Sequence, residues 1–369
     1  MKTKEKIINF IKSEVVLSVA IVLAIITCFF VPPDKEYLGY FDYSTLICLF
    51  CMLAVVAGLK STNVFELISR KLIGLFHTRR AVIYALVFGT FFFDMIVAND
   101  MSLITFLPLT YIVLHSTKND KYLAFTFIMQ TIAANMGGMI TPYGNPQNLY
   151  LYSYYNINTT EFFSILLVPS ITVAVLLWIC CAFVHNEPLK LRKNSKIIIS
   201  KKELCIYSIL FVFVILSIFR VIPYLITLAI VVLTILIMDR KRFKQIDYAL
   251  IATFFVFFVF SGNIARIPAI KEFISEIVVK NTLLAGIVSC QFISNVPTAI
   301  FLSKFTTNYK ELLVSVNIGS LGILISSLAS LITLKEFLKH QPKNFWKYLI
   351  MYTIFNTLFL VVLLLVTTL

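Results

Sequence analysis

The sequence predicts an all-α polytopic membrane protein made of two inverted repeats, each with a re-entrant hairpin and an interrupted transmembrane helix. Three observations predict this fold class. Apolar residues make up 59% of the 369 residues and charged residues only 14%, which is too apolar for an ordinary soluble domain. Apolar runs near the roughly 20 residues that a spanning helix needs recur from residues 15–31 to residues 348–366. Polar breaks rich in asparagine, glycine and proline interrupt these runs twice, in a similar order.

The formal net charge of +14 reflects basic residues that lie in short bursts between the apolar runs, such as residues 190–202 and 239–244. This distribution is typical of membrane topology and not of a groove for nucleic-acid phosphates. Arg220 and Arg266 lie near span ends, where we expect their side chains to reach the membrane surface. The expected partners are therefore a lipid bilayer and a small-molecule or ion substrate, and no nucleic acid.

Counting basic residues beside each apolar run gives one orientation. The N-terminal tail carries Lys2, Lys4, Lys6 and Lys12 and is expected in the cytoplasm, whereas residues 32–42 are acidic and are expected outside. Continuing the count gives about nine full crossings and two excursions that return to the same side, which leaves the C-terminus outside. We expect a multi-pass protein of the plasma membrane, the inner membrane of a bacterium.

Two stretches of the chain begin alike. Asp42 and Asp247 each open an apolar run, and each run carries a glycine near its far end, Gly58 and Gly262. An amphipathic segment, an asparagine-centred break and a second polar break follow in both copies. Copy one begins outside and copy two inside, so the copies are inverted, as in many secondary transporters. The predicted divisions are residues 1–41 (an N-terminal span outside the repeat), 42–161 (first repeat), 162–246 (connecting spans and a basic cytoplasmic loop), 247–334 (second repeat) and 335–369 (a C-terminal span).

The first break of each copy is predicted to be the tip of a hairpin. Residues 283–294 make a helix of about 18 Å, which reaches the middle of a bilayer but cannot cross it. Pro297 then interrupts helical hydrogen bonding, so residues 294–298 form the tip. By the repeat, Asn99 and Asp100 form the other tip. The two segments that flank this tip are longer than a re-entrant hairpin requires, so an ordinary pair of transmembrane helices is the alternative. A carboxylate inside a membrane must face protein, water or an ion, and Asp100 therefore favours a hairpin tip.

The second break of each copy is predicted to unwind a crossing helix, at residues 137–148 and 319–330. Unwound backbone is tolerated in a membrane where it lines a cavity or binds something. Freed carbonyls and side-chain oxygens suit Na⁺, and freed N–H groups at helix N-termini suit an anion. The alternative is that Gly and Pro merely ease helix packing. The candidate substrate- or ion-binding residues are Asn99, Asp100, Gly137, Gly138, Thr141, Pro142, Gly144, Asn145, Asn148, Ser294, Asn295, Pro297, Thr298, Asn317, Gly319, Ser320, Ser326, Ser327 and Ser330.

The coupling ion is expected at Asp100, Asn99 and Asn145. Asp94 is the other acid well inside a predicted membrane segment, and we expect it to pair structurally. We expect no cofactor, no catalytic residue, and no metal beyond Na⁺ as a coupling ion.

The breaks resemble those of the ion transporter superfamily, which includes arsenite permeases, D-type sodium/proton antiporters, citrate transporters and divalent anion/sodium symporters. The resemblance rests on Asn99-Asp100 with Pro108 downstream, on residues 134–148 (Ala-Asn-Met-Gly-Gly-Met-Ile-Thr-Pro-Tyr-Gly-Asn-Pro-Gln-Asn) and on residues 294–298 (Ser-Asn-Val-Pro-Thr). It implies an elevator-type transporter, often a homodimer, whose site is formed by two hairpin tips and two unwound helices. The positions that match the family's binding residues are Asn99, Thr141, Gly144, Asn145, Ser294, Asn295, Thr298 and Asn317.

The chain departs from one branch of that superfamily. The divalent-anion symporters carry Ser-Asn-Thr at both tips, whereas here the first tip reads Ala-Asn-Asp, ending at Asp100, and the second reads Ser-Asn-Val, starting at Ser294. Asp100 instead resembles the arsenite-permease and antiporter branch. The expected function is transport of a small anion or oxyanion (carboxylate, sulfate-like or arsenite-like) coupled to Na⁺ or H⁺; the alternative is sodium/proton antiport without an anion. An enzyme is not expected, because the sequence lacks His-Glu-x-x-His and Gly-x-Ser-x-Gly motifs.

Overall fold

The computed structural model describes residues 14–97, 99–189 and 199–368. Within these ranges every regular element is a helix, and one β-bridge joins Thr78 to Pro188. The basic N-terminal tail and residues 190–198 of the basic loop, both used above to orient the chain, lie outside the described residues, as does residue 98.

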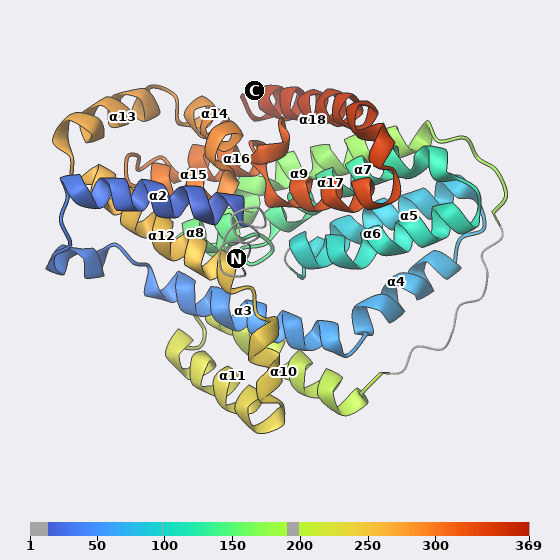
Figure 1. Ribbon diagram of the computed structural model, residues 1–369, viewed down its shortest axis with the longest axis horizontal. Helices are drawn as coiled ribbons and strands as arrows, with labels where there is room; N and C mark the ends of the chain where they lie inside the picture. Colours follow the sequence, from blue (N-terminus) through green and yellow to red (C-terminus); the bar gives the residue numbers. More distant parts are fainter. Residues whose placement is uncertain (1–13, 98, 190–198, 369) are drawn as a thin grey trace, which may run out of the picture.

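Two series of helices follow the same order along the chain (Figure 1). The first series is α3 (Tyr43–Ser61), α4 (Val64–Gly74), α5 (Arg79–Asp94), α6 (Asn99–Ser116), α7 (Leu123–Gly137), the 3₁₀ turn η3 (Gly138–Ile140) and α8 (Pro146–Tyr154). The second series is α12 (Tyr248–Ala265), α13 (Pro268–Lys280), α14 (Thr282–Ile293), α15 (Asn295–Leu302), α16 (Tyr309–Ile318), η5 (Leu324–Ser326) and α17 (Leu328–His340). In both series a long apolar helix, an amphipathic helix, a helical pair and an interrupted helix succeed one another.

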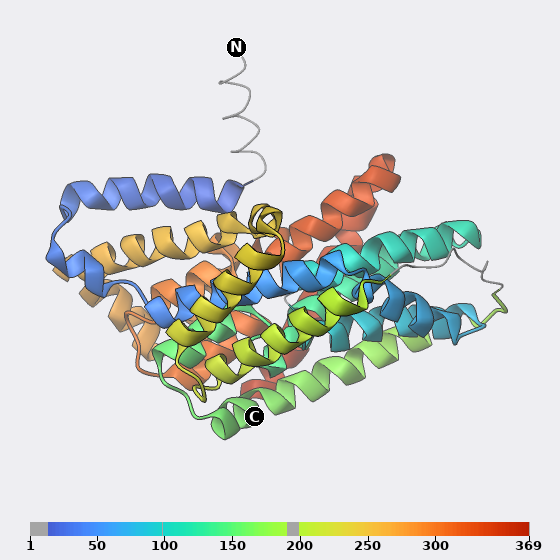
Figure 2. The same ribbon diagram turned by 90° about the horizontal axis from the view of Figure 1, so that it is seen from below.

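The remaining helices pack around these two series. α2 (Val15–Phe30) lies along α12 (Figure 2), and α10 (Lys201–Ile218) and α11 (Tyr224–Met238) pack on α3 (Figure 1). α18 (Phe345–Thr368) crosses α9 (Thr159–Ala182) and α7. Short 3₁₀ helices fill several connections: η1 (Lys35–Gly39), η2 (Asp120–Tyr122), η4 (Arg240–Gln245) and η6 (Pro342–Asn344).

Five described helices are long and apolar enough to cross a membrane: Tyr43–Ser61, Asp120–Ile140, Thr159–Ala182, Tyr248–Ala265 and Pro342–Thr368. A sixth span results if α13 and α14, bent by 117° at their junction, count as one. These helices make the chain an integral, multi-pass membrane protein. The count is lower than the nine crossings predicted, because α2 and α11 are apolar but short and the predicted crossing at residues 311–333 is divided between α16 and α17.

The two long opening helices share local features that the sequence anticipated. Asp42 caps α3 by accepting a hydrogen bond from Thr45 N, and Asp247 caps α12 in the same way from Leu250 N. The glycine near the far end of each helix packs against a tyrosine ring, because a Cβ at Gly58 would overlap Tyr207 and one at Gly262 would overlap Tyr40. Both glycines therefore allow close approach of a neighbouring element.

Arg220 and Arg266 were expected to extend their side chains to the membrane surface. In the structure both also bind protein groups. The guanidinium of Arg220 donates to Tyr152 O at 2.6 Å and to Ile157 O at 3.2 Å, which satisfies carbonyls near the C-terminal end of α8. Arg266 pairs with Asp34 at 2.6 Å. An arginine near a span end prefers such partners when unpaired carbonyls or a carboxylate lie within reach.

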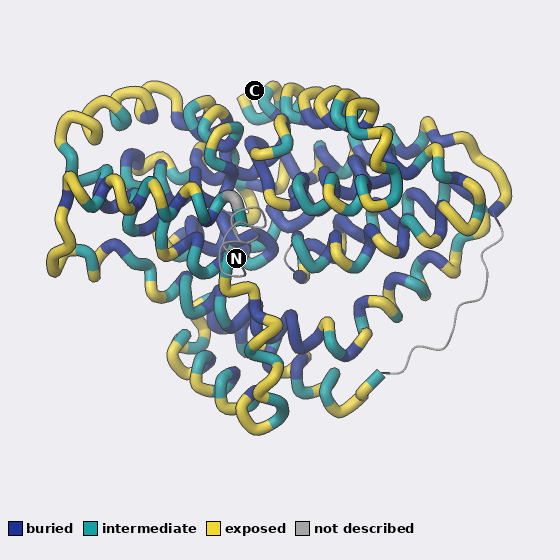
Figure 3. Tube along the Cα trace, in the orientation of Figure 1, coloured by how far each residue is buried: buried dark blue, intermediate teal, exposed yellow. Residues whose placement is uncertain are grey.

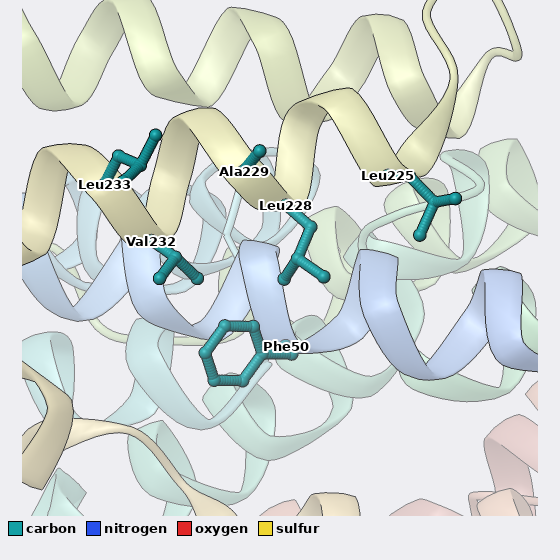
Figure 4. Close-up of a pocket in the computed structure, with 6 residues that line it drawn as sticks. All are labelled: Phe50, Leu225, Leu228, Ala229, Val232 and Leu233. Carbon is teal, nitrogen blue, oxygen red and sulfur yellow. The ribbon is translucent and has the colours of Figure 1, made fainter.

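Burial is concentrated where α7, α8, α15 and α16 meet, while α2, α11, α13 and α18 form the periphery (Figure 3). The exposed side chains of α2, α11 and α18 are mostly apolar, as expected for surfaces that face lipid, whereas α13 is amphipathic. One example is an apolar crevice of about 630 Å³ between Phe50 of α3 and the Leu225, Leu228 and Val232 side chains of α11 (Figure 4).

Candidate functional site

The break between α5 and α6 places a carboxylate against the first interrupted helix. Asp94, the last residue of α5, is fully buried. Its Oδ1 accepts from Ser102 Oγ at 3.0 Å, and its Oδ2 accepts from the backbone N–H of Gly138 at 2.7 Å. Thr141 adds a bond from its hydroxyl to Met95 O at 3.0 Å. The end of α5 therefore holds the start of the unwound segment.

The break between α14 and α15 is a single residue in an unusual conformation. Ser294 has φ 72° and ψ 163°, a region that L-residues other than glycine rarely adopt. Its hydroxyl donates to Ser326 O at 3.3 Å, and Asn295 Oδ1 accepts from Val296 N at 2.9 Å. The predicted tip thus contacts the second interrupted segment. Pro297 lies in the first turn of α15, where a missing N–H costs no helical bond.

The first interruption is shorter than predicted. α7 ends at Gly137 and α8 begins at Pro146, so residues 146–148 are helical and not unwound, because proline is favoured at the first position of a helix. Asn148 Nδ2 lies within bonding distance of three carbonyls, those of Met139 at 3.0 Å and of Gly138 and Thr141 at 3.4 Å. One side chain thus satisfies carbonyls that the missing helical turn would leave unpaired.

The second interruption runs over residues 319–327, so Ser330 is helical, three residues inside α17. Gln291 of α14 holds this segment, since its Nε2 donates to Gly319 O at 2.9 Å and to Leu321 O at 3.0 Å, and its Oε1 accepts from Ile323 N at 3.0 Å. Gln291 thus serves the second segment as Asp94 serves the first. Three of the predicted serines form hydrogen bonds with protein groups. Ser320 donates to Asn317 O, Ser326 donates to Ser320 O, and the Ser330 hydroxyl accepts from Tyr352.

Buried side chains join the two interrupted helices to each other. Asn317 Nδ2 donates to Asn148 Oδ1 at 2.7 Å, and Gln147 Nε2 donates to Asn317 Oδ1 at 3.4 Å. Ser327 Oγ donates to Asn135 Oδ1 at 2.6 Å. In each pair one residue belongs to the first series and the other to the second, more than 160 residues apart. The structure therefore brings the two predicted unwound regions into one buried polar cluster.

Three polar atoms of this cluster are buried and lack a hydrogen-bond partner among the described residues: Asn135 Nδ2, Asn145 Oδ1 and Gln147 Oε1. Buried polar groups are otherwise nearly always paired, so these atoms are free to contact a bound species. A Cβ at Gly138 would lie 2.5 Å from both Asn145 Oδ1 and Asp94 Oδ2, which means that these two oxygens converge on one point. Oxygen atoms of this kind suit a hard cation, whereas the Asn135 amide suits an anion.

The remaining predicted residues lie around this cluster. Asn99 is buried at the first position of α6, and Thr298 donates to Ser294 O inside α15. Asp100 is half-buried and makes no side-chain hydrogen bond or ion pair within the described part of the chain. Within the described residues no hydrogen bond joins the Asp100 side chain to the interrupted helices, whereas Asp94 accepts one from Gly138 N. Gly137 and Gly144 contribute backbone only, and a Cβ at Gly137 would overlap Phe91 O. Pro142 is buried between them in the chain.

Sequence reasoning assigned no role to three members of the cluster, Asn135, Gln147 and Gln291. Asp94 was expected to pair structurally, and it accepts hydrogen bonds from Ser102 Oγ and Gly138 N. Asn135 and Gln147 lie inside the quoted motif of residues 134–148, so their position was a usable signal. Gln291 lies in the mostly apolar α14, and an amide side chain in such a helix also indicates a buried partner.

Known proteins of similar sequence include transporters. The sequence profile of the citrate transporter family, CitMHS, matches residues 7–325. An uncharacterized transporter of Methanocaldococcus jannaschii is 34% identical over 298 residues, which cover 80% of this chain and 81% of that protein. The inner membrane protein YbiR of Escherichia coli is 24% identical over 327 residues, 87% of this chain and 86% of that protein. The putative transporter arsB of Dictyostelium discoideum is 26% identical over 144 residues, 37% of this chain and 24% of that protein.

Proposed function

The chain belongs to the citrate transporter family of the ion transporter superfamily, and on that premise we propose that it is a secondary active transporter of a small anion or oxyanion, coupled to Na⁺ or H⁺. The observation that carries the proposal is the buried polar cluster in which Asn148 and Asn317 tie two interrupted helices together. Such a cluster is costly inside a membrane protein unless it binds a polar species.

The substrate is held by amides, hydroxyls and helix ends, because basic side chains are absent from this part of the described structure. Asn135 Nδ2 and the N-termini of α8 and α17 supply partial positive charge. The description of the family names citrate, so a carboxylate is the first substrate to test, followed by sulfate and arsenite.

Coupling is assigned to the first half of the chain. Asp94 Oδ2 and Asn145 Oδ1 converge beside Gly138, and their chemistry fits a Na⁺ ion. Asp100 and Asn99 at the start of α6 complete the coupling set proposed from the sequence. Asp94 acts at the unwound segment, and Asp100 acts from the first turn of α6.

Alternating access in this proposal follows from two inverted repeats. Residues 99–100 and 294–298 form the tips of re-entrant hairpins, and the interrupted helices carry the substrate site as it moves. An elevator-type movement and a homodimer follow from the superfamily resemblance. We place the N-terminus in the cytoplasm and the C-terminus outside, in the plasma membrane.

Purified protein in proteoliposomes tests the proposal. We expect uptake of labelled citrate, sulfate or arsenite that depends on an inward Na⁺ or H⁺ gradient and that is lost in Asp94→Asn. Glu272→Gln is the control, because it neutralises an exposed carboxylate on α13, outside the polar cluster, and should leave transport unchanged. Uptake that is equally fast without any gradient would overturn the coupling.

Sodium/proton antiport without an anion is the second candidate, and the carboxylate of Asp94 at the unwound segment favours it. A pH-sensitive dye inside the vesicles separates the two. Addition of Na⁺ or Li⁺ releases lumenal protons in the absence of any anionic substrate only if the protein is an antiporter.

A further inference from the structure

A crevice of about 240 Å³ lies between the amphipathic helix α4 and the hairpin arm α6, away from the polar cluster. Its polar wall comes from Lys60 at the end of α3 and from Glu66 and Arg70 of α4. Its other wall comes from Ile104, Pro108 and other apolar residues of α6. A crevice with one cationic wall and one apolar wall fits an amphiphile with an anionic head.

The cations of this crevice are incompletely paired. Arg70 Nη2 contacts Glu66 at 2.5 Å, but Arg70 Nε is buried and has no hydrogen-bond partner among the described residues. Lys60 is exposed and forms no ion pair with any residue that the structure describes. With Glu66 counted, the wall keeps one net positive charge and several N–H donors, which suit the oxygen atoms of a phosphate diester.

The apolar wall of the crevice is itself exposed, and α4 adds an exposed apolar side chain outside the crevice lining. Ile104 and Ile112, two turns apart on one face of α6, are 41% and 48% exposed, and Ile68 on α4 is 47% exposed. Side chains of this kind at the rim of a basic crevice favour a lipid over a water-soluble phosphate, because a soluble ion gains nothing from them. The basic run of residues 60–80 also lies on the side that the charge distribution places in the cytoplasm, where the leaflet is rich in anionic lipid.

We propose that this crevice is a binding site for an acidic phospholipid of the cytoplasmic leaflet. Lys60 and Arg70 contact the phosphate, Glu66 fixes the guanidinium of Arg70, and the apolar residues of α6 contact an acyl chain. Since α6 begins at Asn99, the lipid bridges the amphipathic helix and the arm that carries one side of the proposed transport site. This site is separate from the substrate site and does not depend on which substrate is moved.

Binding of phosphatidylglycerol to the purified full-length protein, measured by native mass spectrometry during titration against phosphatidylcholine, tests the proposal. We expect preferential retention of phosphatidylglycerol and binding weaker by about tenfold or more after Lys60→Gln together with Arg70→Gln, because each basic group near a membrane surface contributes roughly a factor of five. Lys71→Gln is the matched control for Arg70→Gln: it removes the same charge one residue further along α4, from an exposed side chain outside the crevice, and should change binding less than about twofold.

Three results would overturn the site. If phosphatidylcholine is retained as well as phosphatidylglycerol, the crevice has no preference for an anionic lipid. If Lys71→Gln weakens binding as much as Arg70→Gln does, the lipid responds to the overall positive charge of α4 and not to the crevice. Competition by millimolar inorganic phosphate would make the crevice a soluble-anion site. If Arg70→Gln prevents folding, Arg70→Lys keeps the charge and should retain phosphatidylglycerol within about threefold; a loss as large as that of Lys60→Gln would then contradict the proposal.

Discussion

Asn317 of α16 donates from Nδ2 to Asn148 Oδ1 of α8 at 2.7 Å, across 169 residues of chain. The same amide nitrogen donates to Leu313 O at 2.8 Å, and the amide oxygen accepts from Gln147. Asn317 is fully buried. One side chain thus links the interrupted helix of the second series to that of the first, and both helices depend on it for hydrogen bonding.

Replacing Asn317 with alanine should destabilise the protein and abolish transport. The change leaves Asn148 Oδ1 and Gln147 Nε2 buried without this partner, at a cost of about 1–3 kcal/mol per unpaired group. Thermal unfolding in detergent and uptake in proteoliposomes measure the two effects. Asn344→Ala is the control, since Asn344 is exposed and its side chain bonds only to Gln341 in the described structure; its effect should stay within about 0.5 kcal/mol.

Gly138→Ala should impair transport. The added methyl group would lie 2.5 Å from Asp94 Oδ2 and from Asn145 Oδ1, so it would displace the two oxygens assigned to the coupling ion. We expect uptake to fall at least about tenfold and the dependence on Na⁺ or H⁺ concentration to shift to higher concentration. Unchanged ion dependence, with the fold intact by size-exclusion chromatography, would remove these oxygens from the coupling site.

Gly58→Ala should destabilise the contact between α3 and α10. A Cβ at this position overlaps the ring of Tyr207, which is buried. Overpacking of this kind costs about 1–3 kcal/mol, which exceeds the gain of up to about 1 kcal/mol from alanine in a helix. Gly39→Ala, where a Cβ meets nothing within 4 Å, is the control. The double variant with Tyr207→Ala should show a coupling energy of about 0.5–3 kcal/mol, and strict additivity would contradict the contact.

Acid should weaken the contact between Arg79 and Glu187. The buried guanidinium of Arg79 donates to Glu187 Oε2 at 2.8 Å and lowers the pKa of that carboxyl below its usual range. A carboxyl whose pKa is lower in the folded state stabilises the protein fully above its unfolded pKa of about 4.3. That stability is lost as the pH falls through the folded value. The unfolding temperature of the wild type should therefore fall more steeply below about pH 4.3 than that of Glu187→Gln, and parallel curves would contradict the linkage.

Much of the helical order was predictable because it depends on local signals. The caps Asp42 and Asp247, and the proline and glycine positions near the breaks, set where helices begin and end. The ends of the interruptions were less predictable. Pro146 was interpreted as a breaker, but it is the first residue of α8, and only the helix that follows decides between these two roles.

The candidate site was predictable in its regions and not in its partners. The sequence indicated residues 137–148 and 319–330, and the structure joins them through Asn148 and Asn317. It assigned coupling to Asp100 and a structural pairing to Asp94, because the order of residues along the chain does not show which acid meets the unwound segment. Only the packing of α5 against α7 places Asp94 at Gly138, and such long-range contacts leave no periodic pattern in the sequence.

The tie between the two interrupted helices also has a consequence for biosynthesis. Asn148 leaves the ribosome 169 residues ahead of Asn317, which corresponds to about 10–30 s at roughly 5–20 residues per second. During that interval the first interrupted helix has neither Asn317 nor Ser327 to satisfy Asn148 and Asn135. A nascent chain that ends before residue 317 therefore lacks these partners for Asn148 Oδ1 and Asn135 Oδ1, and synthesis of the second series of helices completes the hydrogen bonding of the first.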